Sequence, residues 1–96
     1  MPVSLENLRQ QIHEIDEKLV YLLCKRLQLV HEIGKVKVKH GLPIIDESRE
    51  EEVFNKVLAH PHDPIESDVL KEIFQLIIHV SREEQQKLFV KREKQD

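Results

Sequence analysis

The sequence contains no tryptophan, one cysteine, two glycines and four prolines, and aromatic residues make up only 4% of its 96 residues. So few glycines and prolines argue against a turn-rich β protein. The lone Cys24 excludes a disulfide within the chain, and a single thiol fits a reducing cytoplasm. With so few aromatic residues, the core must be built from aliphatic side chains.

An excess of positive charge is also missing. The chain has 15 lysines and arginines against 18 acidic residues, for a formal net charge of −3, which argues against nucleic acid as a partner. The N-terminal Met-Pro-Val-Ser lacks the basic segment and apolar run of a secretory signal. No stretch approaches the roughly 20 apolar residues of a membrane span. We therefore expect a cytoplasmic protein without a membrane partner.

What the sequence does contain is helical periodicity. Apolar residues recur at alternate spacings of three and four, at Leu5, Leu8, Ile12, Ile15, Leu19, Leu22, Leu29, Ile33 and Val36. This spacing predicts one long helix over about residues 5–39, packed along a seam. Ser4 can cap its start, while Gly41 and Pro43 end it. At about 1.5 Å per residue the helix is roughly 50 Å long.

Two further helices follow. The second is predicted over about residues 47–58, capped by Asp46 or Ser48. The third is predicted over about residues 64–90, with Asp63 as its N-cap and Pro64 in its first position. The polar tail after it is expected to fray. We interpret residues 1–96 as a single all-α domain of three helices, one very long, one short and one of medium length.

The length of the first helix predicts a homodimer. A globule of this size is only about 26 Å across, so one chain cannot cover both ends of a 50 Å apolar stripe. A second copy is expected to cover the rest, which gives a dimeric helical bundle.

Three cations interrupt the apolar face of the long helix. Arg26 occupies a position where the stripe demands an aliphatic residue, and Arg9 and Lys37 lie on the adjoining row. Arg26 alone could set the register of a seam, or the cations could extend to solvent at its rim. However, three cations without a matching acidic row favour a small dicarboxylate ligand, because a buried guanidinium without a carboxylate is costly. Lys37 lies about three turns beyond Arg26, on the same side.

Other polar residues are less specific. Ser81 and Gln85 lie on the apolar stripe of the third helix, as core hydrogen-bonding groups or as ligand contacts. We interpret the segment 46–50 as a helix cap followed by charged residues in solvent, although its backbone N–H groups could bind a ligand oxygen. Gly34 indicates close packing, ligand approach or simple tolerance. The histidines show no metal-ligand spacing, and no nucleophile–base pair or glycine-rich phosphate loop is present.

Four segments together resemble a known family: residues 8–19 (LRQQIHEIDEKL), 25–37 (KRLQLVHEIGKVK), 43–50 (PIIDESRE) and 74–85 (FQLIIHVSREEQ). They resemble the all-helical chorismate mutases of the AroQ class, over about residues 5–88. The resemblance implies an intertwined homodimer with two sites, each of which uses one residue of the partner chain. It also implies rearrangement of chorismate to prephenate in phenylalanine and tyrosine biosynthesis, without a cofactor or metal.

The resemblance implies a role for each polar residue. Arg26, with Arg9 from the other subunit, would hold the two substrate carboxylates, and Lys37 and Gln85 would donate to the ether oxygen. The ring hydroxyl would be held by Glu50 and the backbone near Asp46. Arg49 would support Glu50 or the pocket, and Ser81 would assist at a carboxylate. Because Gln85 needs no proton to donate, we expect activity across neutral pH.

Two observations bear on this assignment. Arg9 and Lys37 are 28 residues apart, about 42 Å along a straight helix, so they cannot reach one small ligand from the same chain. Arg82 and Ile45 depart from the family's usual residues at their positions, which bears on substrate affinity. The alternatives are an isochorismate-pyruvate lyase and a non-catalytic regulatory helical dimer that binds a shikimate-pathway enzyme.

Overall fold

The chain is an assembly of three helices. The computed structural model describes residues 4–95, with side chains through residue 90. Its elements are α1 (Leu5–Lys39), α2 (Glu47–Ala59) and α3 (Ser67–Gln95), and these described residues contain no strand. The predicted all-α class is therefore confirmed. The predicted domain of residues 1–96 extends past the described residues at both ends.

Both ends of α1 are fixed by the residues that the sequence analysis singled out. The Ser4 hydroxyl accepts a hydrogen bond from the Asn7 backbone N–H at 3.0 Å, which satisfies one of the N–H groups that a helix start leaves unpaired. At the other end, Gly41 adopts a φ of 66°. The Leu42 and Gly41 N–H groups then bond to the carbonyls of Lys37 and Val38, a Schellman motif that closes the helix.

The second helix begins where Asp46 caps it, since the Asp46 carboxylate accepts from the Arg49 N–H at 3.0 Å. The third helix differs from the prediction. Residues 62–65 form a turn closed by a bond from the Ile65 N–H to the His62 carbonyl, and the His62 ring also contacts the Ile65 carbonyl. Pro64 is therefore not the first residue of α3, and Asp63 is not its cap.

The end of α3 also differs from the predicted range. The helix continues to Gln95 instead of ending near residue 90. Residues 91–95 are all lysine, arginine, glutamate or glutamine, which are good helix formers, and no glycine or proline interrupts them. Helix propensity therefore extends α3 beyond its last apolar residue.

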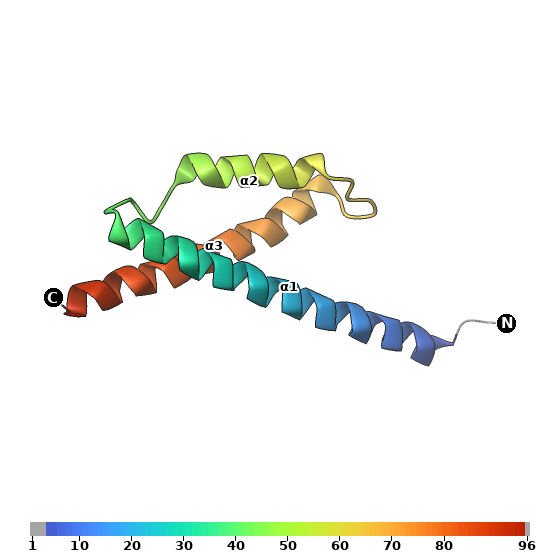
Figure 1. Ribbon diagram of the computed structural model, residues 1–96. Helices are drawn as coiled ribbons and strands as arrows, with labels where there is room; N and C mark the ends of the chain where they lie inside the picture. The colour runs from blue at the N-terminus through green and yellow to red at the C-terminus, as the bar shows by residue number, and fades with distance from the viewer. Residues whose placement is uncertain (1–3, 96) are drawn as a thin grey trace.

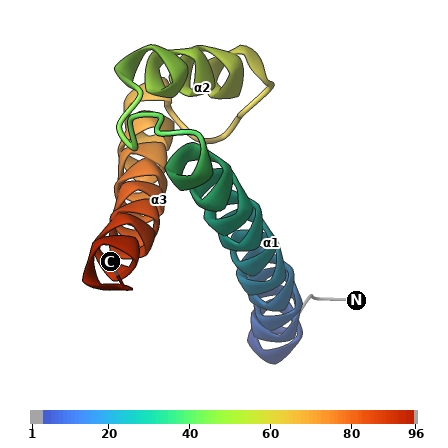
Figure 2. The same ribbon diagram turned by 60° about the vertical axis from the view of Figure 1, so that its left-hand side comes forward.

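The three helices form an open arrangement (Figure 1). The C-terminal part of α1 crosses α3, α2 lies across one side of this pair, and the N-terminal part of α1 projects beyond both. Figure 2 shows the same projection from another side. The chain measures 65 × 27 × 15 Å. No helix in residues 4–95 is long and apolar enough to cross a membrane.

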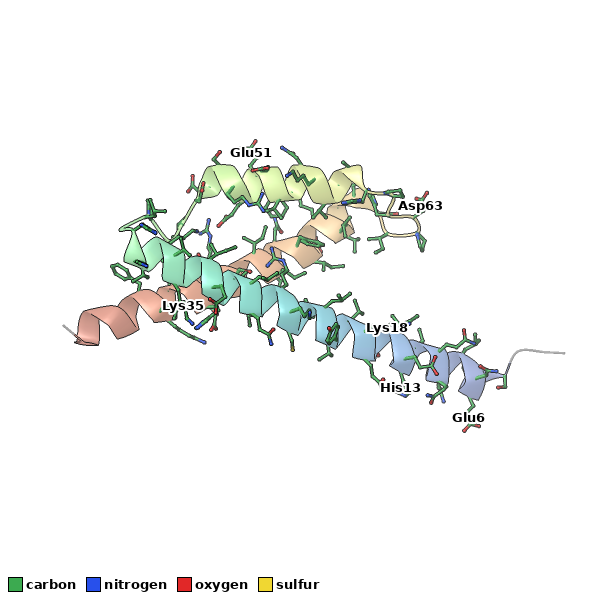
Figure 3. The ribbon with its side chains drawn as sticks, in the orientation of Figure 1. Glu6, His13, Lys18, Lys35, Glu51 and Asp63 are labelled. Atoms are coloured by element: carbon green, nitrogen blue, oxygen red, sulfur yellow. The ribbon has the colours of Figure 1, made fainter. Side chains whose placement is uncertain are left out.

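The core of the described chain is very small. Val30, Leu70 and Ile78 are the only apolar side chains that are buried among the described residues. The nine apolar residues of the α1 stripe are each between 48% and 65% exposed, and every residue from Ser4 to Lys25 is exposed. In Figure 3, Glu6, His13 and Lys18 mark this stretch of α1, which neither α2 nor α3 covers. Among the described residues, most of the apolar face of α1 is therefore exposed.

Candidate functional site

A polar pocket of about 180 Å³ lies where the C-terminal part of α1, the start of α2 and the middle of α3 meet. It is lined by Arg26, Val30, Ile33, Lys37, Ile44, Asp46, Arg49, Glu50, Val53, Ile78, Ser81, Arg82 and Gln85. Seven of the eight predicted site residues are in this set. The exception is Arg9.

Helical spacing explains why these side chains share one pocket. On α1 the lining residues are 26, 30, 33 and 37; around the start of α2 they are 46, 49, 50 and 53; on α3 they are 78, 81, 82 and 85. Apart from the adjacent residues 49 and 50 and the adjacent residues 81 and 82, the intervals are three or four residues, so each set occupies a single helix face. Three such faces meet at the pocket.

Lys37 and Gln85 are linked at the inner end of the pocket. The Lys37 Nζ donates to the Ile44 carbonyl at 2.9 Å and to Gln85 Oε1 at 3.2 Å. Gln85 is only 7% exposed, and its Nε2 donates to the Val30 carbonyl of α1 at 3.1 Å. The two groups hold each other in place. Within the described residues Lys37 bonds to neutral acceptors and has no ion-pair partner.

Close packing at Gly34 makes this arrangement possible. A Cβ added there would lie 2.8 Å from Leu88 Cδ1 and 3.1 Å from Gln85 Cγ. Both distances are shorter than ordinary van der Waals contact. Among the three explanations that the sequence left open for Gly34, the structure selects close packing of α1 against α3.

Arg26 has a neutral partner in place of a carboxylate. Its Nη1 donates to the Ser81 hydroxyl at 2.6 Å, and that hydroxyl donates to the Ile77 carbonyl at 2.9 Å. No carboxylate within residues 4–90 forms an ion pair with Arg26. Burial, and secondly the positive charge of Arg49, lower the pKa of the Arg26 guanidinium. The negative charge of an anion bound in the pocket would offset both effects.

Glu50 has a partner that the sequence analysis did not assign to the site. Arg82 donates from Nε to Glu50 Oε2 at 2.5 Å and from Nη2 to Oε1 at 2.6 Å, and these bonds raise the pKa of Arg82. Arg49, which was predicted to support Glu50 or the pocket, lines the pocket but pairs with Glu52 at 3.3 Å. The spacing of Arg82 from Ile78 and Gln85 would have placed it on the pocket face.

Arg9 lies on the projecting part of α1, where every residue is exposed. It does not line the pocket of its own chain. This agrees with the separation of about 42 Å expected for 28 helical residues.

An apolar groove adjoins the polar pocket through Arg26 and Ser81. It has a volume of about 280 Å³ and is otherwise lined by Leu23, Cys24, Leu27, Leu76, Ile77 and Val80 from α1 and α3. The groove and the polar pocket together form one surface on the crossing of these helices, apolar at one end and cationic at the other.

The lining of the polar pocket suits an anion. Four cationic side chains and two acidic ones surround it, and Arg26 and Lys37 have no carboxylate contact in the described residues. Fixed donors of this kind bind carboxylates and stabilise negative charge that develops during a reaction.

Comparison with known proteins gives consistent matches. A profile of the chorismate mutase type II family matches residues 8–86. A T-protein of Enterobacter agglomerans is 42% identical over 79 residues, covering 76% of this chain and 21% of the relative. A chorismate mutase of Methanocaldococcus jannaschii is 32% identical over 77 residues, covering 78% of this chain and 77% of that one.

A solved structure shows the same fold. The crystal structure of chorismate mutase from Helicobacter pylori in complex with prephenate superposes with a TM-score of 0.79 and 29% sequence identity, covering 86% of this chain and 90% of that one. The chain spans about a fifth or less of the length of the T-proteins that it matches.

Proposed function

Because this chain belongs to the chorismate mutase type II family, we propose that it catalyses the rearrangement of chorismate to prephenate. In this step the ether C–O bond breaks while a C–C bond forms in the same molecule, so no proton or group is exchanged with the protein. The observation that carries the proposal is the polar pocket, in which the hydrogen bonds of Arg26 and Lys37 to other described residues all go to neutral groups. The prephenate complex of the Helicobacter pylori relative supports the choice of ligand.

The two substrate carboxylates require two cationic sites. We assign one carboxylate to Arg26, whose guanidinium can bind it with two parallel hydrogen bonds. The Ser81 hydroxyl, 2.6 Å from Arg26, orients this guanidinium and assists at the carboxylate. We assign the other carboxylate to the partner subunit's Arg9. Holding both ends of the flexible dianion favours the folded conformer in which the reacting carbons approach.

Lys37 and Gln85 would act on the ether oxygen. An ammonium has three N–H donors and an amide nitrogen has two. Two Lys37 donors and one Gln85 donor are used within the protein, which leaves one on each residue for the substrate. Negative charge grows on the ether oxygen as its bond to carbon breaks. Donors fixed before that happens lower the barrier, because they need not reorganise.

At the far side of the pocket, Glu50 and the backbone near Asp46 would hold the ring hydroxyl. The Asp46 carboxylate is already committed to capping α2, so its backbone and not its side chain is assigned to the substrate. Arg49 lines this side of the pocket and adds positive charge near the dianion.

We also propose that the active protein is a homodimer with shared sites. A folded monomer of this mass exposes about 5,800 Å², whereas the chain exposes 8241 Å². The excess of about 2,500 Å² is in the range that one subunit of an obligate dimer buries. Antiparallel pairing of two α1 helices, centred near residues 20–23, would cover the stripe and bring the partner subunit's Arg9 alongside residues 31–37, toward Lys37.

We also propose that the reaction takes place in the cytoplasm. The basis is the lone Cys24, which is exposed and unpaired and so fits a reducing environment.

The test is to incubate the purified protein with chorismate and follow the loss of chorismate and the appearance of prephenate. Incubation with isochorismate, assayed for salicylate and pyruvate, examines the lyase. Lys37→Ala should lower chorismate turnover by about a hundredfold or more. Unchanged turnover in Lys37→Ala, or no turnover by the intact protein, would remove the mutase assignment. A protein that binds chorismate without converting it would be a regulatory dimer.

A further inference from the structure

Glu50 and Arg82 form an ion pair unlike any other in the described chain. Two arginine donors each bond to one carboxylate oxygen, at 2.5 and 2.6 Å. The Arg82 side chain is only 34% exposed and the Glu50 side chain only 21%. The pairs on the outer surface of α2, such as Lys56 with Glu52, are single contacts between side chains that are more than half exposed. Glu51, the neighbour of Glu50, points away from α1 and α3 (Figure 3). The Glu50–Arg82 pair therefore faces inward, between α2 and α3.

This geometry fixes the orientation of the Glu50 carboxylate. The terminal torsion of a glutamate is broad when nothing restrains it. The planar fork of an arginine restrains it, because two parallel bonds define the plane of the carboxylate as well as its position. Arginine has no acceptor, so both Glu50 oxygens accept, and their remaining lone pairs are available to a donor in the pocket.

Arg82 also offsets a charge. A bare carboxylate at the wall of the pocket would repel a substrate that carries two negative charges. Since Arg82 contacts Glu50 directly, the pair as a whole presents no net charge while still presenting acceptors. A neutral pair with acceptors selects a ligand that carries a hydrogen-bond donor on this side.

We propose that Arg82 is a positioning residue that sets substrate specificity: it orients Glu50 so that the site demands a hydroxyl group on the ring of its substrate. This inference rests on the proposed function, because it concerns the same pocket. Arg82 need not touch the substrate, and its effect passes through Glu50. A purely structural role, in which the pair only ties α2 to α3, predicts no link to the ring hydroxyl.

The experiment compares chorismate with an analogue that lacks the ring hydroxyl. The wild-type protein should prefer chorismate in kcat/KM by roughly tenfold to a hundredfold, the range for a hydrogen bond to a charged group. Arg82→Leu should reduce this preference to less than about threefold, mainly by lowering kcat/KM for chorismate. Glu50→Gln should change the preference in the same direction. The double variant should add little, since the two residues act as one unit.

Two further variants make the result decisive. Lys56→Ala removes an exposed ion pair of α2 outside the pocket and should retain the wild-type preference. Arg82→Lys keeps the charge but not the fork, and it should give an intermediate preference; it carries the test if Arg82→Leu fails to fold. If a folded Arg82 variant keeps the full wild-type preference for chorismate over the analogue, the inference is overturned. Arg82 then only ties α2 to α3. A wild-type protein that does not convert chorismate overturns the proposed function instead.

Discussion

Gly34 of α1 and Gln85 of α3 lie so close that a Cβ on the glycine would approach Gln85 Cγ to 3.1 Å and Gln85 Cα to 3.6 Å. The missing side chain allows α3 to approach the backbone of α1. That approach brings the Gln85 amide within hydrogen-bond distance of the Val30 carbonyl and of Lys37. The position of the Gln85 amide, which we propose as a donor to the ether oxygen, therefore depends on a glycine in α1.

We predict that Gly34→Ala lowers activity more than stability. Alanine favours the helix by about 1 kcal/mol over glycine, which offsets much of the overlap with Leu88 Cδ1 and Gln85 Cγ. We expect a Tm within a few degrees of wild type. Displacement of Gln85 should lower kcat by about tenfold or more. Thermal melts and steady-state kinetics measure the two effects.

Gly41→Ala is the matched control. Gly41 has open space around it but a φ of 66°, so alanine there is strained. This variant should lower the Tm and leave kcat near the wild-type value. Full kcat in Gly34→Ala would show that close packing at residue 34 does not position Gln85.

Replacing Arg26 should separate binding from stability. The lowered pKa of Arg26 means that the folded chain holds this charge less well than the unfolded chain does. The guanidinium stays protonated in both states near neutral pH, so this cost does not vary with pH there. Arg26→Met should therefore keep or raise the Tm at every pH from about 6 to 8, while kcat/KM for chorismate falls roughly a thousandfold.

Lys25→Met is the control for this substitution, because Lys25 is adjacent in sequence but lies over the Tyr21 ring, 5.5 Å from its centroid, outside the pocket. It should leave kcat/KM close to wild type. A large fall in Tm for Arg26→Met, with activity lost only in proportion to unfolding, would contradict the assignment of Arg26 to a carboxylate.

The dependence of activity on pH should change when Gln85 becomes glutamate. The wild-type amide donates at any pH, so activity should vary little between about pH 6 and 8. A carboxyl group can donate only when protonated, and the Lys37 ammonium at 3.2 Å from Gln85 Oε1 favours the ionised form. Gln85→Glu should therefore gain kcat/KM as the pH falls. A flat profile for Gln85→Glu would mean that residue 85 does not donate to the substrate.

Mixing two inactive variants tests whether sites are shared. Arg9→Ala and Arg26→Met homodimers should both be nearly inactive. After the two are unfolded and refolded together, half of the dimers are mixed, and each mixed dimer has one intact site. Activity should recover to about one quarter of wild type. A mixture of Arg26→Met with Lys37→Met should not recover, because both residues serve the site of their own chain. No recovery in the first mixture would place Arg9 outside the partner's site.

Most of the fold follows from local rules that operate within a few residues. Spacings of three and four marked α1, and Ser4 and Gly41 marked its ends. The start of α3 did not follow, because His62 and Ile65 satisfy each other in a turn. Pro64 suits a helix start but does not require one. Whether these residues form a turn or a helix cap depends on side-chain and backbone contacts, which intrinsic helix propensity does not describe.

The sequence predicts most of the residues that line the pocket, but not the hydrogen bonds and ion pairs between them. Helical spacing placed Arg26, Lys37 and Gln85 on common faces, since periodicity fixes direction. The pairing of Glu50 with Arg82 depends on how α2 lies across α3, 32 residues later, and no spacing within one helix specifies that. In the sequence Arg82 differs from the family's usual residue, but its contact with Glu50 lies between two helices.

The projecting half of α1 has a consequence for local opening of the chain. From Ser4 to Lys25 every residue is exposed, so in a lone chain only interactions within the helix itself oppose opening there. Such a segment frays readily, because most helical stability in proteins comes from packing. Its amide hydrogens would be among the fastest in the chain to exchange with solvent deuterons, whereas those around Val30 would exchange slowly. Slow exchange over residues 5–25 would map directly where another surface covers this helix.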